Sequence, residues 1–442
     1  MKLHKENISI IGLGFVGLSI AVVNASKGFH TYGIDIDTTK IKNLEKGKVS
    51  FFEPQLEKYL KSSLSSKKIE FSNDFMKILD SDITFLTVGT PPKKSGEINL
   101  SSIKSALKQI SKVLEKKEKY HLLVVKSTLT PETTKKLIIP FFKKQIAFNQ
   151  MDVVVNPEFL QEGVAIKDVL NPHIIVIGAY NKKASQSLIK YYKKFYKTPP
   201  EIMQVGITTA ELIKYANNSF LATKISFINS IANICQKLPD VDVDNVAYAI
   251  GKDNRIGSLF LKAGPGFGGS CLPKDLSGLI SFSKKIGNVS PFFEAVENVN
   301  KSQPEKIFTI MKTMKILAPK NTVSILGLSF KKNTDDIRES VAIKIVEKCL
   351  NYGLKVKVHD SMAIPNFKKL FSNKIKYHKS ITSCLQSSDC CIILTDSDEY
   401  KKLQSKNFLI MSKKNVIDTR RILNHKKLQN INFHAIGWGQ KN

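Results

Sequence analysis

Cysteine is scarce in this chain, with six residues among 442. They stand at positions 235, 271, 349, 384, 390 and 391. No two have the Cys-x-x-Cys spacing, and none lies with histidine at the spacing of a zinc ligand set. The scarcity excludes a disulfide-stapled scaffold, and we expect reduced thiols, no metal site and a cytoplasmic protein.

Long apolar runs are also missing. No uninterrupted stretch of about 18 apolar residues occurs, so we expect no membrane-spanning helix. The run from Ile8 to Val23 follows Lys2 and Lys5 and superficially resembles a secretory signal. Three glycines interrupt that run, at intervals of two and three residues, and indicate a different role.

Acidic residues are few relative to basic ones. Lysine and arginine total 68 and aspartate and glutamate 38, which gives a net charge of +30. This excess predicts an anionic partner: nucleic acid, an anionic membrane or a phosphorylated small molecule. The hydrophobic content of 42% excludes a disordered chain, and the length predicts two to four domains.

Short apolar strands alternate with helical stretches in the first part of the chain. The predicted strands are Asn7–Ile11, Thr31–Ile36, Asp82–Val88, Leu122–Lys126 and Asp152–Val155. A second, weaker set stands at 322–326, 355–359, 390–394 and 415–418. Strands joined by helices in this way predict an α/β fold with two Rossmann-like, doubly wound parallel sheets.

The stretch between the two sets differs from both. No glycine or proline occurs from Thr208 to Leu238, and apolar residues recur there at helical spacing until Pro239. A helix this long is typical of a domain connection or a dimer interface. The predicted domains are 1–200, 201–310 and 311–442.

Gly12, Gly14 and Gly17 form the pattern Gly-x-Gly-x-x-Gly directly after the first strand. The glycines allow a tight turn, close approach of backbone to a pyrophosphate, and close contact of helix and strand. Asp35, 18 residues after Gly17, ends the second strand, where a carboxylate binds a ribose diol and repels a 2′-phosphate. The combination predicts NAD rather than NADP, with an ordinary βα turn as the alternative.

The segment Gly264–Asp275 is rich in glycine and carries one cysteine, Cys271, followed by Lys274 and Asp275. Glycines remove side chains from a loop, so that a ligand can lie against its backbone. A nearby cation favours a reactive thiolate, and a carboxylate can hold a proton. We interpret Cys271 as a nucleophile and the other five cysteines as small buried apolar residues.

Two further segments place polar groups at helical spacing. Glu158 and Glu162 follow a predicted strand and would share one face if their segment is helical. Lys214 and Asn218 lie one turn apart on the long helix, where both can donate to a developing oxyanion. A solvated helix face is the alternative for each pair.

These segments, taken in order, resemble the UDP-glucose/GDP-mannose dehydrogenase family of nucleotide-sugar 6-dehydrogenases over nearly the whole chain. The motifs are GLGFVG, GIDID, VGTPP, KSTLTPETT, NPEFLQEG, ELIKYANNSFLATKISFIN, DNRIG, GPGFGGSCLPKD, LGLSFKKNTDDIRES and DTR. The resemblance implies oxidation of the sugar C6 alcohol to a carboxylate in two NAD-dependent steps.

The same resemblance implies catalytic roles. Cys271 corresponds to the nucleophile that holds the aldehyde as a thiohemiacetal, which is oxidised to a thioester and hydrolysed. Glu158 resembles the general base or a water-orienting carboxylate, and Thr128 the hydroxyl that helps to position water. Lys214 and Asn218 resemble the groups that stabilise the C6 oxyanion.

Binding positions are implied in the same way. Those for NAD are Gly12, Gly14, Phe15, Val16, Gly17, Asp35, Lys40, Thr90, Thr128, Glu162, Lys274 and Arg338. Those for the nucleotide sugar are Glu158, Phe159, Leu160, Glu162, Lys214, Asn218, Phe260, Leu261, Lys262, Ala263, Gly264, Gly268, Lys331 and Arg420. Asp275 resembles an acid/base partner of the thiol. Arg255 resembles an arginine that reaches the substrate of a neighbouring subunit, so a homodimer through the long helix is implied.

The sugar stays open between UDP-glucose, GDP-mannose and a UDP-N-acetylhexosamine. Some relatives that act on N-acetylhexosamine nucleotides have histidine before the cysteine, where this chain has Ser270. The Arg255–Gly257 segment and the compact GPGFGG loop resemble the UDP-glucose branch, which we favour. Two departures from the family pattern, Pro92 and Ser230, remove no proposed catalytic group.

Two other function classes compete. A nucleic-acid-binding Rossmann protein would account for the charge, but no helix-turn-helix, zinc finger or aromatic-interleaved basic stripe occurs. A sugar-nucleotide sensor without activity conflicts with the intact set of candidate catalytic groups. We therefore expect neither a nucleic-acid nor a membrane partner, and we assign most of the charge surplus to a lysine-rich solvated surface.

Overall fold

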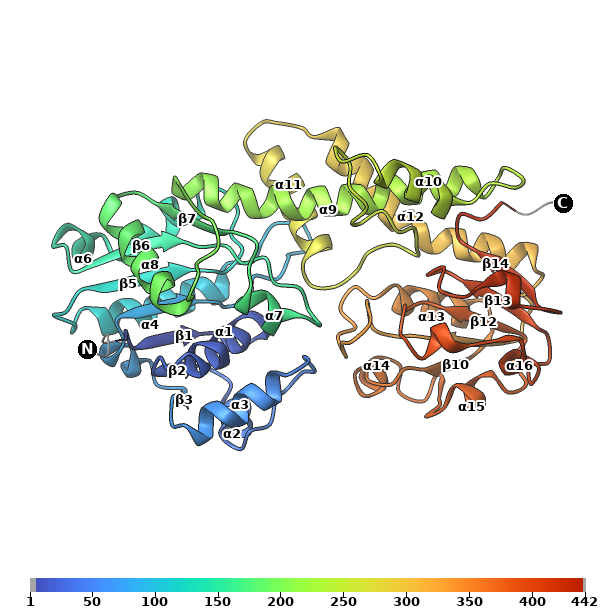
Figure 1. Ribbon diagram of the computed structural model, residues 1–442, viewed down its shortest axis with the longest axis horizontal. Coiled ribbons are helices and arrows are strands. Elements are labelled where there is room, and N and C mark those ends of the chain that lie inside the picture. The colour runs from blue at the N-terminus through green and yellow to red at the C-terminus, as the bar shows by residue number, and fades with distance from the viewer. Residues whose placement is uncertain (1–4, 440–442) are drawn as a thin grey trace. The chain divides into compact units, whose positions relative to one another are not determined.

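The structure is a computed structural model that describes residues 5–439 (Figure 1). The chain divides into two compact units, Met1–Asn217 and Asn218–Asn442, and each unit has its own sheet. One helix, α9 (Ile207–Cys235), begins in the first unit and ends in the second. Over the described residues, no helix is both long and apolar enough to cross a bilayer.

The first unit contains an eight-stranded sheet in the order β3-β2-β1-β4-β5-β6-β7-β8. The strands are β1 (Ile8–Ile11), β2 (Thr31–Ile34), β3 (Ile69–Ser72), β4 (Ile83–Leu86), β5 (His121–Val125), β6 (Met151–Val155), β7 (Ile175–Ala179) and β8 (Ile202–Val205). Strands β1 to β6 pair in parallel, which confirms the doubly wound sheet. β7 runs antiparallel to β6, a reversal that the sequence did not predict because side-chain burial carries no mark of strand direction.

Helices cover both faces of this sheet. They are α1 (Phe15–Ser26), α2 (Thr38–Glu45), α3 (Leu56–Ser65), α4 (Ser101–Leu114), α5 (Ile139–Phe141), α6 (Lys143–Ala147), α7 (Ala165–Leu170) and α8 (Lys182–Phe195), with a 3₁₀ segment at Phe75–Asp80 and a π segment at Thr134–Ile138. Leu122 and Val124 of β5 join one buried apolar cluster, and Leu123 and Val125 join another. This alternation shows that a hydrophobic core lies on each side of the sheet.

The run that resembles a secretory signal is a strand, a glycine turn and a helix of the core. Every residue of α1 from Gly17 to Ala25 is buried. The one amide side chain in that stretch, Asn24, donates to the Ile20 carbonyl and accepts from the Tyr191 hydroxyl at 2.7 Å. The apolar run therefore reflects a helix that is covered on all sides.

The second unit begins with the C-terminal part of α9 and ends in a second doubly wound sheet. Its other helices are α10 (Val243–Gly251), α11 (Leu272–Lys285), α12 (Pro291–Thr313), α13 (Val341–Asn351), α14 (Ile364–Phe371), α15 (Ile381–Leu385) and α16 (Ser405–Phe408), with 3₁₀ segments at Tyr400–Lys402 and His425–Lys427. The strands are β9 (Thr322–Leu326), β10 (Lys355–His359), β11 (Lys376–Tyr377), β12 (Cys390–Ile393), β13 (Asn415–Asp418) and β14 (Asn432–Ala435). They are parallel throughout, in the order β11-β10-β9-β12-β13-β14.

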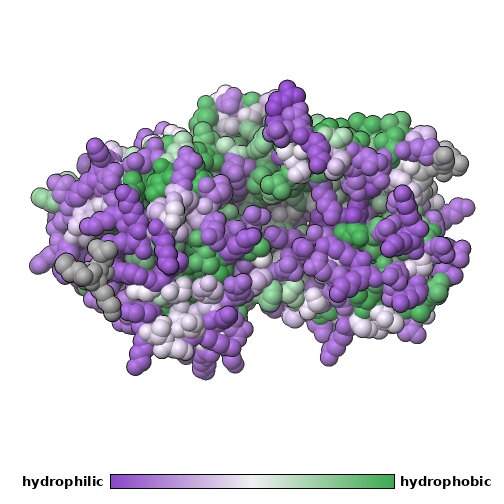
Figure 2. Space-filling view, viewed as in Figure 1, coloured by the Kyte–Doolittle hydropathy of each residue, from purple (hydrophilic) through white to green (hydrophobic). Residues whose placement is uncertain are grey.

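The surface is mostly hydrophilic on the face that Figure 2 shows. Helix α8 illustrates this pattern, because its lysines at 182, 183, 190 and 193 are exposed while its apolar side lies on the core. Helix α9 is different. Its side chains Leu212, Phe220, Phe227 and Ile234 remain 45%, 64%, 51% and 56% exposed.

Candidate active site

The glycine turn after β1 has the form that the sequence predicts. Gly12 adopts φ +93°, and a Cβ there would lie 2.9 Å from the backbone of Val88. A Cβ on Gly17 would overlap the carbonyl oxygen of Gly12, so helix and turn touch. A Cβ on Gly14 would meet nothing within 4 Å, which leaves space beside the uncapped first turn of α1. The turn therefore fits a pyrophosphate.

Asp35 lies just beyond β2, beside that turn. Its Oδ2 accepts from the Leu13 amide at 2.8 Å and from Lys40 Nζ at 2.7 Å. Burial would raise the pKa of Asp35, but hydrogen bonds from Lys40 and from the Asp37 and Leu13 amides hold it below the ordinary value. An ionised carboxylate at this place fits a ribose diol and disfavours a 2′-phosphate, so the residues fit NAD.

The loops after β4 and β5 are joined at the carboxyl edge of the sheet. The Thr90 hydroxyl donates to the Thr128 carbonyl oxygen at 3.0 Å. One residue earlier, Ser127 Oγ donates to the Val88 carbonyl oxygen at 2.7 Å. Ligands of doubly wound sheets bind at this edge, which places both threonines where a cofactor or substrate can reach them.

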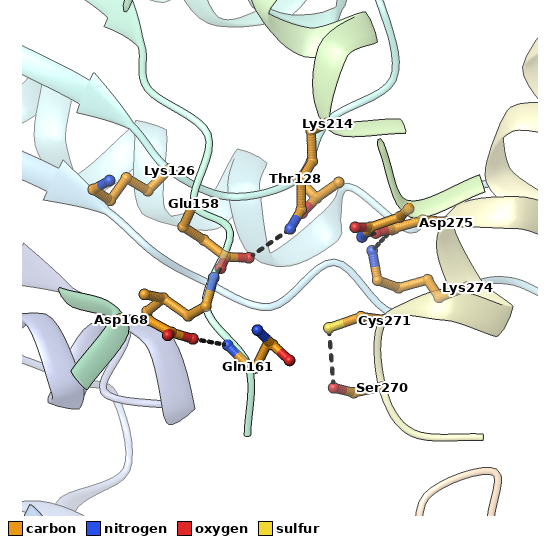
Figure 3. A network of polar contacts seen from close by, with 12 residues as sticks. Lys126, Thr128, Glu158, Gln161, Asp168, Lys214, Ser270, Cys271, Lys274 and Asp275 are labelled. Atoms are coloured by element: carbon orange, nitrogen blue, oxygen red, sulfur yellow. Dashed lines mark hydrogen bonds and ion pairs between the residues drawn. The ribbon is translucent and has the colours of Figure 1, made fainter. Parts of the chain in front are cut away.

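Glu158 and Lys214 form a buried ion pair in the first unit (Figure 3). Lys214 Nζ lies 3.1 Å from Glu158 Oε1, with side chains only 5% and 8% exposed. The other carboxylate oxygen accepts from the Leu160 amide at 2.5 Å, and the ammonium lies 5.4 Å from the centre of the Phe159 ring. A fixed carboxylate and a fixed ammonium can hold a proton and an oxyanion, respectively.

Lys126 belongs to the same cluster, although the sequence did not single it out. Burial lowers its pKa to about 8, with Glu158 opposing the shift and Lys214 adding to it. Its Nζ donates to the Asn156 carbonyl oxygen at 3.4 Å. The signal for Lys126 was its place at the end of a predicted strand, two residues before Thr128.

The segment that carries Glu158 and Glu162 is not helical, so the shared-face argument for this pair is wrong. Residues 156–161 have no regular secondary structure, and Gly163 adopts φ +86°. Buried Glu53 holds the segment as a loop by accepting from the Gly163 amide at 2.6 Å and from the Ala165 amide at 2.8 Å. Glu53 acts from more than a hundred residues away, beyond the reach of a local pattern.

Cys271 lies at the N-cap of α11, at the end of the glycine loop. It is partly exposed, and its Sγ lies 3.5 Å from Ser270 Oγ (Figure 3). The other five cysteines are free and buried, as predicted. Burial raises the pKa of Cys349 and of Cys384 to about 12, which keeps those thiols protonated and inert.

Asp275 has partners on two sides. Asn218 Nδ2 donates to its Oδ2 at 2.6 Å, and Lys274 forms an ion pair with its Oδ1. The side chain of Asp275 is 1% exposed. Lys214 and Asn218 do lie one turn apart on α9, but the one pairs with Glu158 and the other with Asp275. Each is therefore oriented by a carboxylate.

The cysteine loop lies against the segment after β9, within the second unit. A Cβ on Gly268 would overlap the Glu339 carbonyl oxygen, and one on Gly269 would lie 2.6 Å from the Phe330 ring. The Gly269 amide donates to the Arg338 carbonyl oxygen at 3.0 Å. Only glycine permits so close an approach of the two backbones.

Arg420 approaches the same loop from the end of β13. Its Nε donates to the Leu394 carbonyl oxygen at 2.7 Å and its Nη2 to that of Phe330 at 3.2 Å. Burial lowers its pKa, although an arginine stays charged. Nη1 lies 3.5 Å from where a Cβ on Gly264 would be. A charged, partly buried guanidinium at a sheet edge suits a phosphate-bearing ligand.

Two other predicted arginines stand in solvent. The Arg255 side chain is 89% exposed and pairs with Asp253 at 2.6 Å. Arg338 is 61% exposed and pairs with Asp336 at 2.5 Å. Each carboxylate lies two residues before its arginine, so both ion pairs are local in the sequence.

The remaining predicted positions lie near these groups in sequence. They are Phe15 and Val16 in the first turn of α1, Phe260, Leu261, Lys262 and Ala263 before the glycine loop, and Lys331 after β9. Leu261 and Ala263 are buried, whereas Lys262 is exposed. In the described part of the chain, no three His, Cys, Asp or Glu side chains gather as a metal site would require.

Comparison with known proteins shows which family the chain resembles in sequence and fold. Residues 6–196 match the NAD binding domain of the UDP-glucose/GDP-mannose dehydrogenase family, residues 208–302 its central domain and residues 324–425 its UDP binding domain. A UDP-glucose 6-dehydrogenase of Rickettsia bellii is 39% identical over 442 residues, covering 98% of this chain and 100% of that protein. A UDP-glucose 6-dehydrogenase of Bacillus subtilis is 37% identical, covering 98% and 93%. A solved UDP-glucose dehydrogenase from Pyrobaculum islandicum is 33% identical, with a TM-score of 0.92 and 99% of both chains covered.

Proposed function

The chain belongs to the UDP-glucose/GDP-mannose dehydrogenase family, and from that premise we propose that it converts UDP-glucose, two NAD⁺ and water to UDP-glucuronate and two NADH. The observation that carries the proposal is the state of Cys271. Among the described residues it is the one cysteine that is not buried, and it starts α11 directly after the glycine loop. A nucleophilic thiol is what separates a four-electron oxidation from a simple alcohol dehydrogenase.

The first unit holds NAD, which when bound accepts the hydride released in each oxidation. Gly12, Gly14 and the start of α1 bind its pyrophosphate, and Asp35 with Lys40 binds a ribose. The further NAD positions we propose are Phe15, Val16, Gly17, Thr90, Thr128, Glu162, Lys274 and Arg338.

Cys271 supplies the covalent chemistry. Its thiolate adds to the aldehyde carbon, and the carbonyl oxygen becomes the oxyanion of a thiohemiacetal. Oxidation of that adduct leaves a thioester. Water then attacks the thioester carbon, the carbon–sulfur bond breaks, and the carboxylate leaves as the thiol is restored. Asp275, held by Asn218 and Lys274, exchanges the proton of the thiol.

Glu158 and Lys214 serve the oxygen atoms of this sequence. Glu158, fixed by Lys214 and the Leu160 amide, accepts a proton from the attacking water, which Thr128 orients. Lys214 and Asn218 donate to the C6 oxyanion. Burial lowers the pKa of Lys126 to about 8, so this ammonium stays mostly charged at neutral pH but gives up its proton more readily than an ordinary lysine.

The second unit takes the nucleotide. A match to a UDP binding domain supports a uridine nucleotide over GDP-mannose, and the guanidinium of Arg420 suits the diphosphate of that nucleotide. The positions we propose for the nucleotide sugar are Glu158, Phe159, Leu160, Glu162, Lys214, Asn218, Arg255, Phe260, Leu261, Lys262, Ala263, Gly264, Gly268, Lys331 and Arg420. UDP-N-acetylhexosamine stays an alternative substrate.

We also propose a division of the chain into three domains, 1–200, 201–310 and 311–442.

A homodimer and a cytoplasmic location complete the proposal. The exposed apolar residues Leu212, Phe220, Phe227 and Ile234 follow one another at intervals of eight, seven and seven, so they form a stripe along α9. A second copy of this helix would cover that stripe. Free cysteines throughout suit a reducing compartment. Sedimentation analysis of Phe227→Glu should show a monomer where the parent chain is a dimer.

The decisive experiment measures NADH formed per sugar consumed. UDP-glucose should yield two NADH, with GDP-mannose and UDP-N-acetylglucosamine run beside it. Cys271→Ala should yield no more than one, because the thiohemiacetal cannot form, while the matched variant Cys235→Ala should behave as the parent. Two NADH per sugar from Cys271→Ala would overturn the mechanism, and oxidation of another sugar nucleotide alone would overturn the substrate.

A further inference from the structure

The cysteine loop is clamped by one side chain of α12. Asn300 Oδ1 accepts from the Phe267 amide at 2.7 Å, and Asn300 Nδ2 donates to the Phe267 carbonyl oxygen at 3.0 Å. One amide side chain thus pairs with both backbone groups of one loop residue, as a neighbouring β-strand would. Phe267 lies four residues before Cys271.

The loop is shaped to admit this contact. Gly266 adopts φ +106°, and a Cβ there would lie 2.8 Å from Asn300 Oδ1. Any side chain at this position would force the asparagine amide away from the loop. On the other flank, the Gly264 amide donates to Asn229 Oδ1 of α9 at 2.8 Å.

The part of α12 that carries Asn300 is itself held against the neighbouring helices. Ser226 of α9 donates to the Val296 carbonyl oxygen of α12 at 2.8 Å, one turn before Asn300. The Phe267 ring is buried among Ala222, Leu276, Ile280 and Val296, which come from α9, α11 and α12. Because three helices meet around this ring, movement of Asn300 relative to the loop is restricted on both sides of the contact.

We propose that Asn300 is a positioning residue for the Cys271 thiol. Between Phe267 and Cys271 the chain is Gly-Gly-Ser, which by itself would leave the thiol free to sample many positions. Two hydrogen bonds to Phe267 fix the start of that short tether, and the first turn of α11 fixes its end. The inference rests on the proposed role of Cys271 and identifies Asn300 as the residue that orients its thiol.

Gln303 provides a matched control on the same helix. It lies three residues after Asn300, is fully buried, and its Cβ lies 3.5 Å from where a Cβ on Gly266 would be. Neither polar atom of its side chain has a hydrogen-bond partner. It therefore touches the same loop without clamping it, and its replacement by Met removes no hydrogen bond.

The test compares Asn300→Leu, Asn300→Asp and Gln303→Met in the full-length protein. For each we would measure kcat and KM with UDP-glucose, the NADH yield, the thermal midpoint, and the alkylation rate of the native protein by iodoacetamide. The alkylation reports on Cys271 because the other five thiols are buried. Asn300→Leu should lower kcat at least about tenfold with a smaller change in KM, because misplacement of a reacting group by an ångström is this costly.

Asn300→Asp should fall between the parent and Asn300→Leu, because it keeps the acceptor for the Phe267 amide and loses the donor. Gln303→Met should keep the parent kcat. Equal kcat in Asn300→Leu and the parent, with Cys271→Ala inactive in the second oxidation, would overturn the positioning role alone. A fall in thermal midpoint without a change in kcat or alkylation rate would show that Asn300 is only structural. Full activity of Cys271→Ala would overturn the proposed function instead.

Discussion

The turns after β1 and β9 occupy corresponding places in the two sheets of this protein. Each sheet has the same strand order around its central strand, β2-β1-β4 in the first unit and β10-β9-β12 in the second. Gly12 follows β1 with φ +93°, and Gly327 follows β9 with φ +96°. In both turns a Cβ on the glycine would collide with the backbone after the neighbouring strand. The two units therefore begin from the same strand–turn frame.

An acidic residue accompanies each turn, but the two are committed differently. Asp35 and Asp360 each accept from the amide that follows the turn glycine at 2.8 Å. The other oxygen of Asp360 accepts hydrogen bonds from the amides of Met362 and Ala363. The other oxygen of Asp35 accepts from one amide, that of Asp37, and the oxygen bound to the Leu13 amide also pairs with the Lys40 ammonium. A ligand can compete for a lysine pair more readily than for a set of backbone amides, so we expect Asp35 rather than Asp360 to meet a ribose.

The elements after the turns differ as well. α1 begins three residues after Gly12, whereas α13 begins fourteen residues after Gly327. The intervening segment of the second unit lies along the cysteine loop through Phe330 and the Arg338 carbonyl. The same frame thus leads at once to a helix N-terminus in the first unit, and to a long segment that supports the Cys271 loop in the second.

Replacement of the second turn glycine should have the largest effect. In Gly327→Ala the new methyl would lie 2.7 Å from the Thr395 amide nitrogen, at a left-handed φ. Strain and overpacking together should lower the free energy of unfolding by about 2–4 kcal/mol. Urea unfolding of the full chain measures this. If the variant is as stable as the parent, Gly327 is not under the steric constraint that we infer for both turn glycines.

The free energy of unfolding should also depend on pH through Glu211 of the first unit, by nearly as much as Gly327→Ala lowers it. Burial raises the pKa of Glu211 to about 7, against hydrogen bonds from Thr134 and the charge of Lys135. Because the folded protein then holds this proton more tightly than the unfolded chain, stability is full below about pH 4.5 and falls as the pH rises toward 7. The loss should reach about 3 kcal/mol at most.

Glu211→Gln should remove that part of the pH dependence, because the amide keeps an acceptor for the Thr134 amide and never ionises. Unfolding midpoints measured between about pH 5 and pH 8 would show a flatter profile than that of the parent. An unchanged slope would locate the pH response elsewhere.

The two acidic residues should respond differently to the same substitution. Asp360→Asn removes one acceptor oxygen from a carboxylate that binds several backbone amides, and should cost about 1–3 kcal/mol of stability. Asp35→Asn should cost less stability but weaken discrimination against NADP. Paired unfolding curves and cofactor titrations would measure both. Equal loss of stability in the two variants would contradict the distinction drawn between them.

Gly14→Ala should have the smallest effect on the fold and a selective effect on the ligand. Gly14 has φ −77°, which alanine adopts freely, and its Cβ meets no protein atom. Stability should change by no more than about 0.5 kcal/mol. NAD affinity should fall about tenfold, since the methyl occupies the space beside the pyrophosphate. Calorimetric titration with NAD measures the effect, and unaltered affinity would remove Gly14 from the cradle.

The sequence predicted those features whose cause is local. The glycine turn and the strand ends follow from residue spacing alone, because each glycine has a steric role within its own βα unit. The interpretation of Glu158 and Glu162 failed because Glu53 fixes their loop from a distant part of the chain. Asn300 was missed because a polar residue within a helical pattern is usually taken to face solvent. Its contact with Phe267 exists only in the folded chain.

The contact of Gly268 and Gly269 with Glu339 and Phe330 also limits how this protein can evolve. Neither glycine can gain a side chain without collision with the opposite segment. A side chain at Gly269 therefore requires a smaller residue at 330 in the same lineage, so these two positions should vary together among descendants. No substitution at 339 makes room at Gly268, because the atom opposite is a backbone oxygen.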